Sequence, residues 1–167
     1  NIPEGHLVFD ARFILRRENR ETIKARVKEL MDIRKQRQPW GMPSAGSAFE
    51  VVVNRLEDLG VPTICRLNGG VYGGSTDLAL ACDFRIGVDT AEMFMPAARL
   101  GLHYYKSGIA RYVSRLGVDN AKMLFLTAQK IPAPEMLRIG YLTAMVPAEA
   151  LDGEVDRLAT ILAGNAP

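Results

Sequence analysis

The segment best suited to chemistry is a glycine-rich turn that leads to one acidic residue. Its sequence, NGGVYGGSTD at residues 68–77, holds four glycines within six positions, and Gly73 and Gly74 lie shortly before Asp77. Glycine loses more backbone freedom on folding than any other residue. A cluster of this kind therefore indicates a place where the backbone adopts a conformation, or approaches a partner, that a side chain would obstruct.

The elements on either side of the turn indicate what it could do. Residues 61–68 predict a buried strand, and residues 76–83 predict a short helix that opens near residue 75. The first N–H groups of a helix lack intrahelical partners and carry partial positive charge, so they can stabilise a ligand oxyanion. A tight turn that needs positive φ angles explains the same glycines without any ligand. A phosphate cradle is disfavoured, because neither G-x-G-x-x-G nor Gly-Lys-Ser/Thr occurs at the turn.

Asp77 lies one turn into the predicted helix. A carboxylate at that place interacts favourably with the helix N-terminus, which is a sufficient structural reason for it. It would also lie within reach of a molecule bound at the turn, where it could orient water or move a proton. Both interpretations stand.

Length and composition narrow the class of protein. The 167 residues, 48% hydrophobic and 24% charged, are typical of a single folded domain with a real core. A net charge of +2 is too small to indicate a general nucleic-acid surface. No apolar run reaches the roughly 18 residues of a membrane-spanning helix, and no signal peptide is recognised at the N-terminus. We therefore expect neither nucleic acid nor a membrane as partner.

Cysteine and histidine usage points to an intracellular protein without a metal centre. Cys65 and Cys82 lie in apolar surroundings without metal-like spacing, so we expect no disulfide framework and a reducing, cytoplasmic setting. His6 and His103 are far apart in the sequence, which argues against a His-rich metal site.

Strands alternate with helices, which predicts an α/β fold. The expected elements before residue 120 are a strand at 6–15, an amphipathic helix at 18–38, a loop at 39–46, helices at 47–60, 76–83 and 107–117, and strands at 61–68 and 84–88. Residues 120–164 predict helix, Pro-marked turn, helix, strand and helix. Asn19 or Thr22 could cap the first helix, whose basic face suits solvent, with a nucleic-acid or membrane surface as the alternative.

Residues 62–102, PTICRLNGGVYGGSTDLALACDFRIGVDTAEMFMPAARLGL, resemble the enoyl-CoA hydratase/isomerase (crotonase) superfamily. The segments SGIARYVSRLG at 107–117 and FLTAQKIPAPEMLRIGYLTAMVPAEAL at 125–151 agree with it. The resemblance covers residues 47–167 and matches 1–46 poorly. It implies a single crotonase-like domain over 1–167, an α/β spiral of repeated strand–helix (ββα) units that is shortened at both ends.

The resemblance also implies a ligand, an assembly and a pathway. The family binds coenzyme A thioesters, so the expected partner is an acyl-CoA substrate, with coenzyme A entering as part of it and no separate cofactor or metal. Homotrimers or hexamers are the family habit, and fatty acid metabolism is the expected context.

Two backbone N–H groups hold the thioester oxygen in this family, and the resemblance carries them to this chain. Gly74 matches the donor at the glycine turn, and Ser47, in SAGSA at 44–48, is the best match for the second donor. Gly70 and Gly73 are expected to line the substrate beside them.

The family's hydratases use two carboxylates. Asp77 occupies the position of the first, whereas Ala97, in PAARLGL, occupies the position of the second and has no proton to give. His103, Tyr104 and Tyr105 follow in LHYYKSG at 102–108, where His103 could titrate near neutral pH and a tyrosine could donate a hydrogen bond to substrate. A partly exposed aromatic loop or a subunit contact explains the tyrosines equally well.

The sequence therefore predicts a CoA-thioester lyase or isomerase of the enoyl-CoA hydratase type. Catalysis would depend on Gly74, Asp77 and His103, and Ser47 and Ala97 would help to line the substrate. The alternative is a crotonase-fold acyl-CoA-binding or assembly module whose chemistry is impaired.

Overall fold

The structure is a computed structural model that describes residues 19–22, 24–26, 28–29 and 45–165. The chain divides into two compact units, Asn1–Ser44 and Ala45–Pro167. The second unit contains the glycine turn and the elements around it.

In the first unit the described residues between Arg20 and Glu29 are helical and exposed. The side chain of Asn19 accepts a hydrogen bond from the backbone N–H of Glu21 at 2.7 Å, which identifies Asn19 as the cap that the sequence left open between two residues. The strand expected at 6–15 and most of the loop expected at 39–46 lie outside the described residues.

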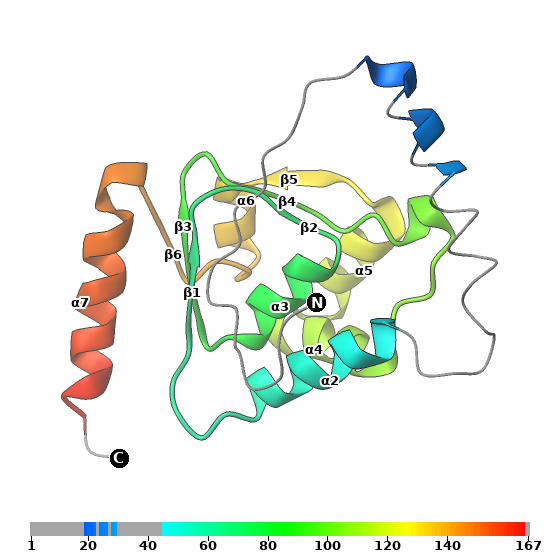
Figure 1. Cartoon of the computed structure of the whole chain (residues 1–167). Helices are drawn as coiled ribbons and strands as arrows, with labels where there is room; N and C mark the ends of the chain where they lie inside the picture. Colours follow the sequence, from blue (N-terminus) through cyan, green and yellow to red (C-terminus); the bar gives the residue numbers. More distant parts are fainter. Residues whose placement is uncertain (1–18, 23, 27, 30–44, 166–167) are drawn as a thin grey trace, which may run out of the picture. The chain divides into compact units, whose positions relative to one another are not determined.

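The second unit alternates helices with short strands (Figure 1). In chain order its elements are α2 (Ala45–Glu57), β1 (Ile64–Leu67), β2 (Val71–Tyr72), α3 (Gly74–Ala81), β3 (Phe84–Val88), β4 (Glu92–Phe94), the 3-10 turn η1 (Ala98–Leu100), α4 (Lys106–Leu116), α5 (Val118–Thr127), β5 (Lys130–Pro132), α6 (Ala133–Arg138), β6 (Ala144–Val146), η2 (Ala148–Ala150) and α7 (Leu151–Ala163).

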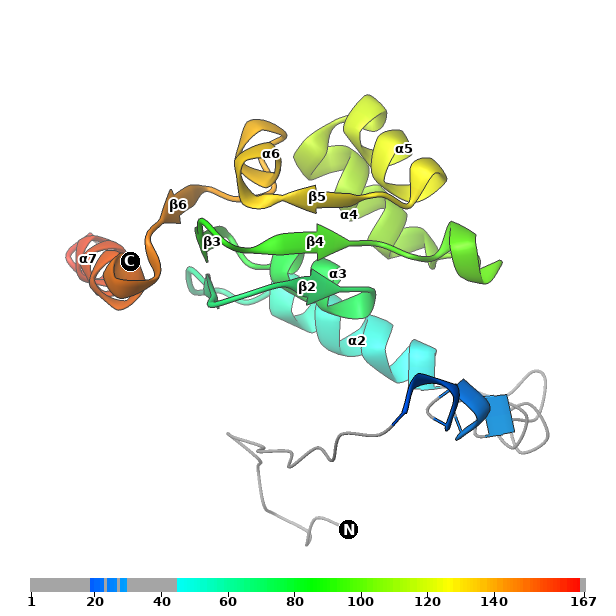
Figure 2. The same ribbon diagram turned by 90° about the horizontal axis from the view of Figure 1, so that it is seen from above.

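The strands form two small sheets. One sheet has the order β1-β3-β6 and is parallel throughout, with Ile64 of β1 opposite Phe84 of β3. The other has the order β2-β4-β5, where β2 and β4 are parallel and β5 is antiparallel to β4. Seen from above, β2, β4 and β5 lie side by side (Figure 2).

The first four strands alternate between the two sheets, and this creates a repeat. β1 and β2 are followed by α3, and β3 and β4 are followed by η1 and α4, so each turn of the chain adds one strand to each sheet before a helix returns it. This is the crotonase-like spiral of ββα units expected from the sequence. The arrangement brings the start of α3, the end of the glycine turn, beside α2 and α4.

The hydrophobic core draws on both sheets and on helices α3 to α6. Leu80, Ile86, Met93, Leu124 and Met136 each come from a different element and are almost completely buried. Close packing of this kind fixes the relative positions of the elements that contribute to it. Helix α3, which begins at the glycine turn, is therefore held by the core along its length.

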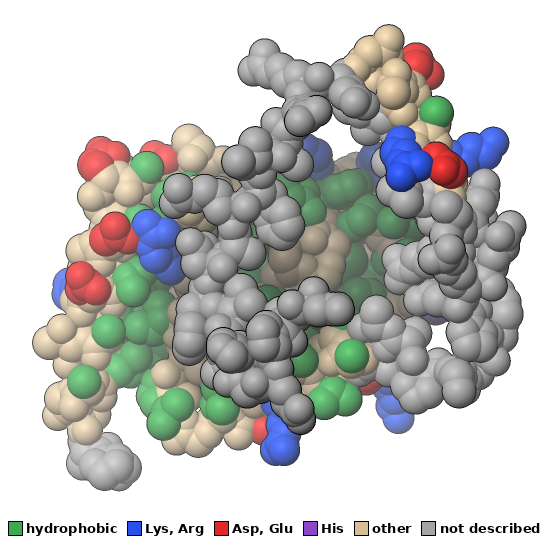
Figure 3. Space-filling view, viewed as in Figure 1, with side chains coloured by type: hydrophobic (Ala, Val, Ile, Leu, Met, Phe, Trp, Pro, Cys, Tyr) green, Lys and Arg blue, Asp and Glu red, His purple; other side chains and the backbone are tan. Residues whose placement is uncertain are grey.

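The last helix, α7, packs against β1 and β3 on the side away from α3 (Figure 1). Its residues Leu151, Val155 and Leu158 contact the core at helical spacing. Figure 3 shows hydrophobic side chains along the flank of α7 that faces the strands and charged side chains along its outer flank. The helix expected at the end of residues 120–164 is therefore confirmed as α7.

Two helices begin or end at other residues than expected, and two short strands were not expected at all. α2 spans Ala45–Glu57 rather than 47–60, and α3 begins at Gly74 rather than at residue 76. The strands β2 and β5 have two and three residues and were not predicted, because such short segments show no readable alternation. The strand expected at 84–88 is confirmed as β3.

Candidate active site

Gly73 gives the glycine turn its geometry. Its φ of 57° and ψ of −126° belong to a region that residues with a side chain rarely adopt, so this position needs glycine for a structural reason. Its N–H donates to the carbonyl of Phe94 in β4 at 2.8 Å, and its carbonyl accepts from the backbone N–H of Thr76 at 3.1 Å and from the Thr76 hydroxyl at 2.6 Å. The turn is thereby fixed to β4 on one side and to α3 on the other.

Gly74 is the first residue of α3, where a backbone N–H has no intrahelical acceptor. Within residues 45–165 no hydrogen bond is made by this N–H. A Cβ at Gly74 would lie 3.1 Å from the ring of Phe49, whereas a Cβ at Gly73 would meet no atom of the described residues within 4 Å. The N–H of Gly74, the candidate donor to an oxyanion, therefore lies beside the aromatic ring of Phe49 from α2. On the Gly73 side, no described atom would contact an added Cβ.

Asp77 lies one turn further along α3, and its side chain has no exposed area. One carboxylate oxygen, Oδ1, is 2.7 Å from Nη1 of Arg111 in α4. The other oxygen, Oδ2, accepts a short hydrogen bond from the hydroxyl of Tyr105. Both oxygens of this carboxylate are therefore engaged by named partners.

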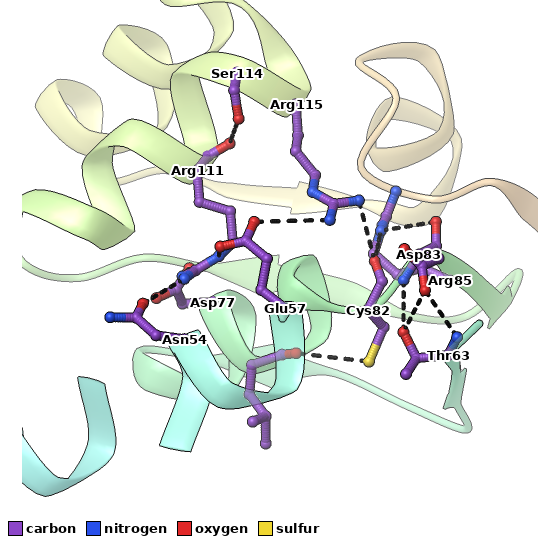
Figure 4. A network of polar contacts seen from close by, with 11 residues as sticks. Asn54, Glu57, Thr63, Asp77, Cys82, Asp83, Arg85, Arg111, Ser114 and Arg115 are labelled. Carbon is purple, nitrogen blue, oxygen red and sulfur yellow. Dashed lines mark hydrogen bonds and ion pairs between the residues drawn. The ribbon is translucent and has the colours of Figure 1, made fainter. Parts of the chain in front are cut away.

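Arg111 is equally buried and joins three helices (Figure 4). Its Nη2 donates to Oδ1 of Asn54 at 2.8 Å, and its Nε lies 2.9 Å from Oε2 of Glu57, an ion pair whose angle does not make a hydrogen bond. Burial alone would lower the pKa of this guanidinium, but the hydrogen bond to Asp77 and the charges of Asp77 and Glu57 outweigh burial and raise it. Arg111 is thus held as a cation between α2 and α3.

Tyr105 precedes α4, and its ring stacks on that of Tyr104 with 4.5 Å between centroids. Burial, and then the hydrogen bond to Asp77, raise the pKa of the Tyr105 phenol to about 12. Burial also raises the pKa of Tyr104, whose hydroxyl is buried and has no hydrogen-bond partner among the described residues. Gly108 makes room for this stack, since a Cβ there would lie 2.5 Å from the Tyr104 ring.

The structure brings together four of the residues singled out from the sequence. Gly74 and Asp77 share α3, Tyr105 binds the carboxylate of Asp77, and Tyr104 supports Tyr105. The Tyr105 hydroxyl, one of the two that the sequence offers as a donor to substrate, donates to Oδ2 of Asp77.

The other residues singled out from the sequence lie elsewhere in the second unit. His103 is exposed and, within the described part of the chain, makes no side-chain hydrogen bond. Ala97 is buried at the start of η1 and packs in the core. Ser47 lies in the first turn of α2, and at Gly70 the hydroxyl of Tyr72 lies where a side chain would be, 2.3 Å from an added Cβ.

Arg111, Asn54 and Glu57 were not singled out from the sequence. Asn54 and Glu57 are three residues apart on α2, and Arg111 adjoins the buried Tyr112 on α4. An arginine beside the apolar face of a predicted helix was the available signal. Nothing in the sequence pairs α2 with α4, so the contacts of that arginine could not be read from it.

The described residues carry neither a membrane-spanning helix nor a metal-binding cluster. No helix in this part of the chain is long and apolar enough to cross a membrane. No group of three or more His, Cys, Asp or Glu side chains in the same residues is arranged to hold a metal ion. Cys65 and Cys82 are free thiols.

Known proteins have a similar fold and a similar sequence. The sequence pattern of the enoyl-CoA hydratase/isomerase family matches residues 32–167. The short-chain-enoyl-CoA hydratase of Clostridium acetobutylicum is 36% identical over 116 residues, which cover 70% of this chain and 44% of that protein. The crystal structure of an enoyl-CoA hydratase from Bacillus anthracis aligns with a TM-score of 0.71 at 28% identity, over 90% of this chain and 51% of the other.

A methylmalonyl-CoA decarboxylase in complex with 2-nitronate-propionyl-CoA aligns equally well, with a TM-score of 0.71 at 26% identity over 75% of this chain and 48% of that one. The fold, the glycine turn at the start of α3 and these similarities define one class. The chain belongs to the enoyl-CoA hydratase/isomerase family. It spans about half the length of the relatives it matches.

Proposed function

We propose that this chain binds an acyl-CoA thioester at the glycine turn and acts as a lyase or isomerase of the enoyl-CoA hydratase type. The observation that carries the proposal is the N–H of Gly74, which opens α3 without an acceptor and has Asp77 one turn away. A thioester carbonyl placed there would develop negative charge as an enolate forms. A preorganised N–H at a helix N-terminus stabilises that charge in the transition state.

The proposal includes a second N–H donor and excludes a separate cofactor. Ser47 lies in the first turn of α2, where backbone N–H groups also lack intrahelical acceptors, and Phe49 of the same helix touches Gly74. Coenzyme A would enter as part of the substrate, and the methylmalonyl-CoA decarboxylase of similar structure holds a coenzyme A compound, 2-nitronate-propionyl-CoA. A cytoplasmic location, a trimeric or hexameric assembly, a catalytic role for His103 and a place in fatty acid metabolism stay predictions.

An impaired acyl-CoA-binding or assembly module is the second candidate. Two observations favour it: Ala97 supplies no acid, and the carboxylate of Asp77 is fully buried and ion-paired. Such a module would retain the thioester pocket but would not exchange the protons next to the carbonyl.

Exchange of the α-protons of an acyl-CoA with deuterated solvent separates the two candidates. The enzyme stabilises the enolate, so exchange should exceed the rate without protein and should saturate with ester. Saturable binding without exchange would support the module instead. Neither binding nor exchange with short, branched and aromatic esters would contradict both.

A further inference from the structure

The buried position of Asp77 raises the question of how its charge could reach a bound molecule. Its side chain has no exposed area, and Arg111 and Tyr105 occupy its two oxygens. Because the carboxylate is wholly buried, direct contact with a water molecule or an α-carbon would require a side chain around it to move. Tyr105, in contrast, is partly exposed and touches the carboxylate through its hydroxyl.

We propose that Tyr105 is the group that exchanges protons with the substrate and that Asp77 acts through it. This inference rests on the proposed function and adds to it the identity of the proton carrier. Asp77 is then a positioning residue and proton reservoir, and Arg111 sets the orientation of its carboxylate.

The hydrogen-bond arrangement decides the direction in which Tyr105 works. A hydroxyl has one proton, and that of Tyr105 is donated to Oδ2 of Asp77. The phenolic oxygen therefore faces its surroundings with lone pairs only, and a hydrogen bond to a carboxylate increases the electron density on that oxygen. Such an oxygen accepts a proton from water or from an α-carbon.

The location fits the oxyanion donor. Phe49 lies against Gly74 and makes an edge-on contact with the ring of Tyr105, with 6.4 Å between the ring centroids. Tyr105 and Gly74 therefore border the same aromatic ring. Gly74 lies one turn before Asp77 on α3, and Tyr105 is hydrogen-bonded to the carboxylate of Asp77. A thioester whose oxygen is bound by the N–H of Gly74 would place its acyl carbons near Tyr105.

For the addition of water the steps balance as follows. The water oxygen bonds to the β-carbon while its proton passes to Oη of Tyr105, and the proton of Tyr105 passes to Oδ2 of Asp77. The C=C electron pair moves to the thioester as an enolate, whose oxygen is held by Gly74. The proton on Asp77 then returns through Tyr105 to the α-carbon, which restores the phenol and the carboxylate.

One relay delivers both protons in this scheme. The position of the second family carboxylate, Ala97, then needs no acid. The two observations that favoured an impaired module, the alanine and the buried aspartate, are both compatible with catalysis if Tyr105 is the accessible end of the pair.

Replacement of one hydroxyl tests the relay. Tyr105→Phe should slow α-proton exchange by roughly 100-fold or more, as expected when an acid–base group is lost, while the affinity for the ester changes little. Thr160→Val is the control, because it also removes one hydroxyl, that of Thr160, which donates to the carbonyl of Asp156 at 2.8 Å on the exposed side of α7. The control should exchange protons at the parent rate.

A second variant tests the pair without disturbing the stacked rings. Asp77→Asn keeps an oxygen for the Tyr105 hydroxyl but cannot take its proton, so it should slow exchange as much as Tyr105→Phe. The double variant should be no slower than the slower single variant, because both changes interrupt one relay.

The possible outcomes distinguish failure of the Tyr105 relay from failure of the proposed function. Binding of the ester with an unchanged exchange rate in Tyr105→Phe or in Asp77→Asn would overturn the relay alone. A double variant whose loss equals the product of the single losses would show two independent groups and would also overturn it. A parent protein that neither binds nor exchanges any ester would overturn the proposed function, and the relay with it.

Discussion

The guanidinium of Arg111 lies 2.7 Å from the carboxylate of Asp77, and neither side chain is exposed to solvent. The pair links α4 to the helix that opens at the glycine turn, and Asn54 and Glu57 extend the link to α2. Buried charges are costly unless they are paired, so the members of such a pair depend on each other. The orientation of Asp77, and with it that of Tyr105, therefore depends on Arg111.

Removal of Arg111 should be strongly destabilising. Arg111→Met leaves the carboxylate of Asp77 buried without its cation, and the expected loss in free energy of unfolding is about 3–5 kcal/mol. Arg138→Met is the control, since Arg138 is exposed and pairs with Glu135 on the surface at 2.6 Å. Its loss should be about 0–1 kcal/mol. Urea unfolding measures both, and equal losses would show that the buried pair contributes no more than the exposed one.

Stability at alkaline pH should report on Tyr105. Its pKa is raised to about 12 in the folded protein, above the ordinary 10.0, so folding favours the protonated phenol. The stabilisation is complete below pH 10 and is lost as the pH rises towards 12, because ionisation places a negative charge in a partly buried site and removes the proton donated to Asp77.

Comparison with Tyr105→Phe isolates this contribution from the other tyrosines. Over the same alkaline range the thermal midpoint of the parent should fall more steeply than that of the variant. Parallel curves would mean that Tyr105 does not share its proton with the carboxylate in solution.

A methyl group at the proposed oxyanion donor should interfere with the site. In Gly74→Ala the new Cβ lies 3.1 Å from the ring of Phe49, so the ring must shift, and we expect weaker binding of acyl-CoA. Gly153→Ala provides the comparison, because a Cβ there meets nothing within 4 Å on the exposed side of α7. That change should raise stability by about 0.5–1 kcal/mol and leave binding unaltered. Equal affinities in the two variants would remove Gly74 from the site.

Much of the fold was predictable because its signals are local. The strand at 84–88 and the helix near 107–117 follow from apolar spacing, and both appear at nearly those bounds. β2 was missed because two residues between glycines carry no periodicity, and its pairing with β4 is a tertiary contact. The spiral of strand–helix units was implied by the family resemblance, whereas no local pattern indicates that its strands divide between two sheets.

The site was predictable only in part, for a related reason. The glycine turn and Asp77 can be recognised from residue type and order. Arg111 can be assigned to the site only when the structure places α4 against α3. The direction of the Tyr105 hydrogen bond was also hidden, since a tyrosine can donate to substrate or to protein. Only the spatial arrangement shows that its proton is already committed to Asp77.

The central claim is that this chain holds an acyl-CoA thioester at the start of α3. Calorimetric titration of the purified chain with short, branched and aromatic acyl-CoA esters, and with free coenzyme A, tests it most directly. We expect micromolar binding whose affinity depends on the acyl group and is lower in Gly74→Ala. Absence of binding by every ester, or affinities that neither the acyl group nor Gly74→Ala alters, would contradict it.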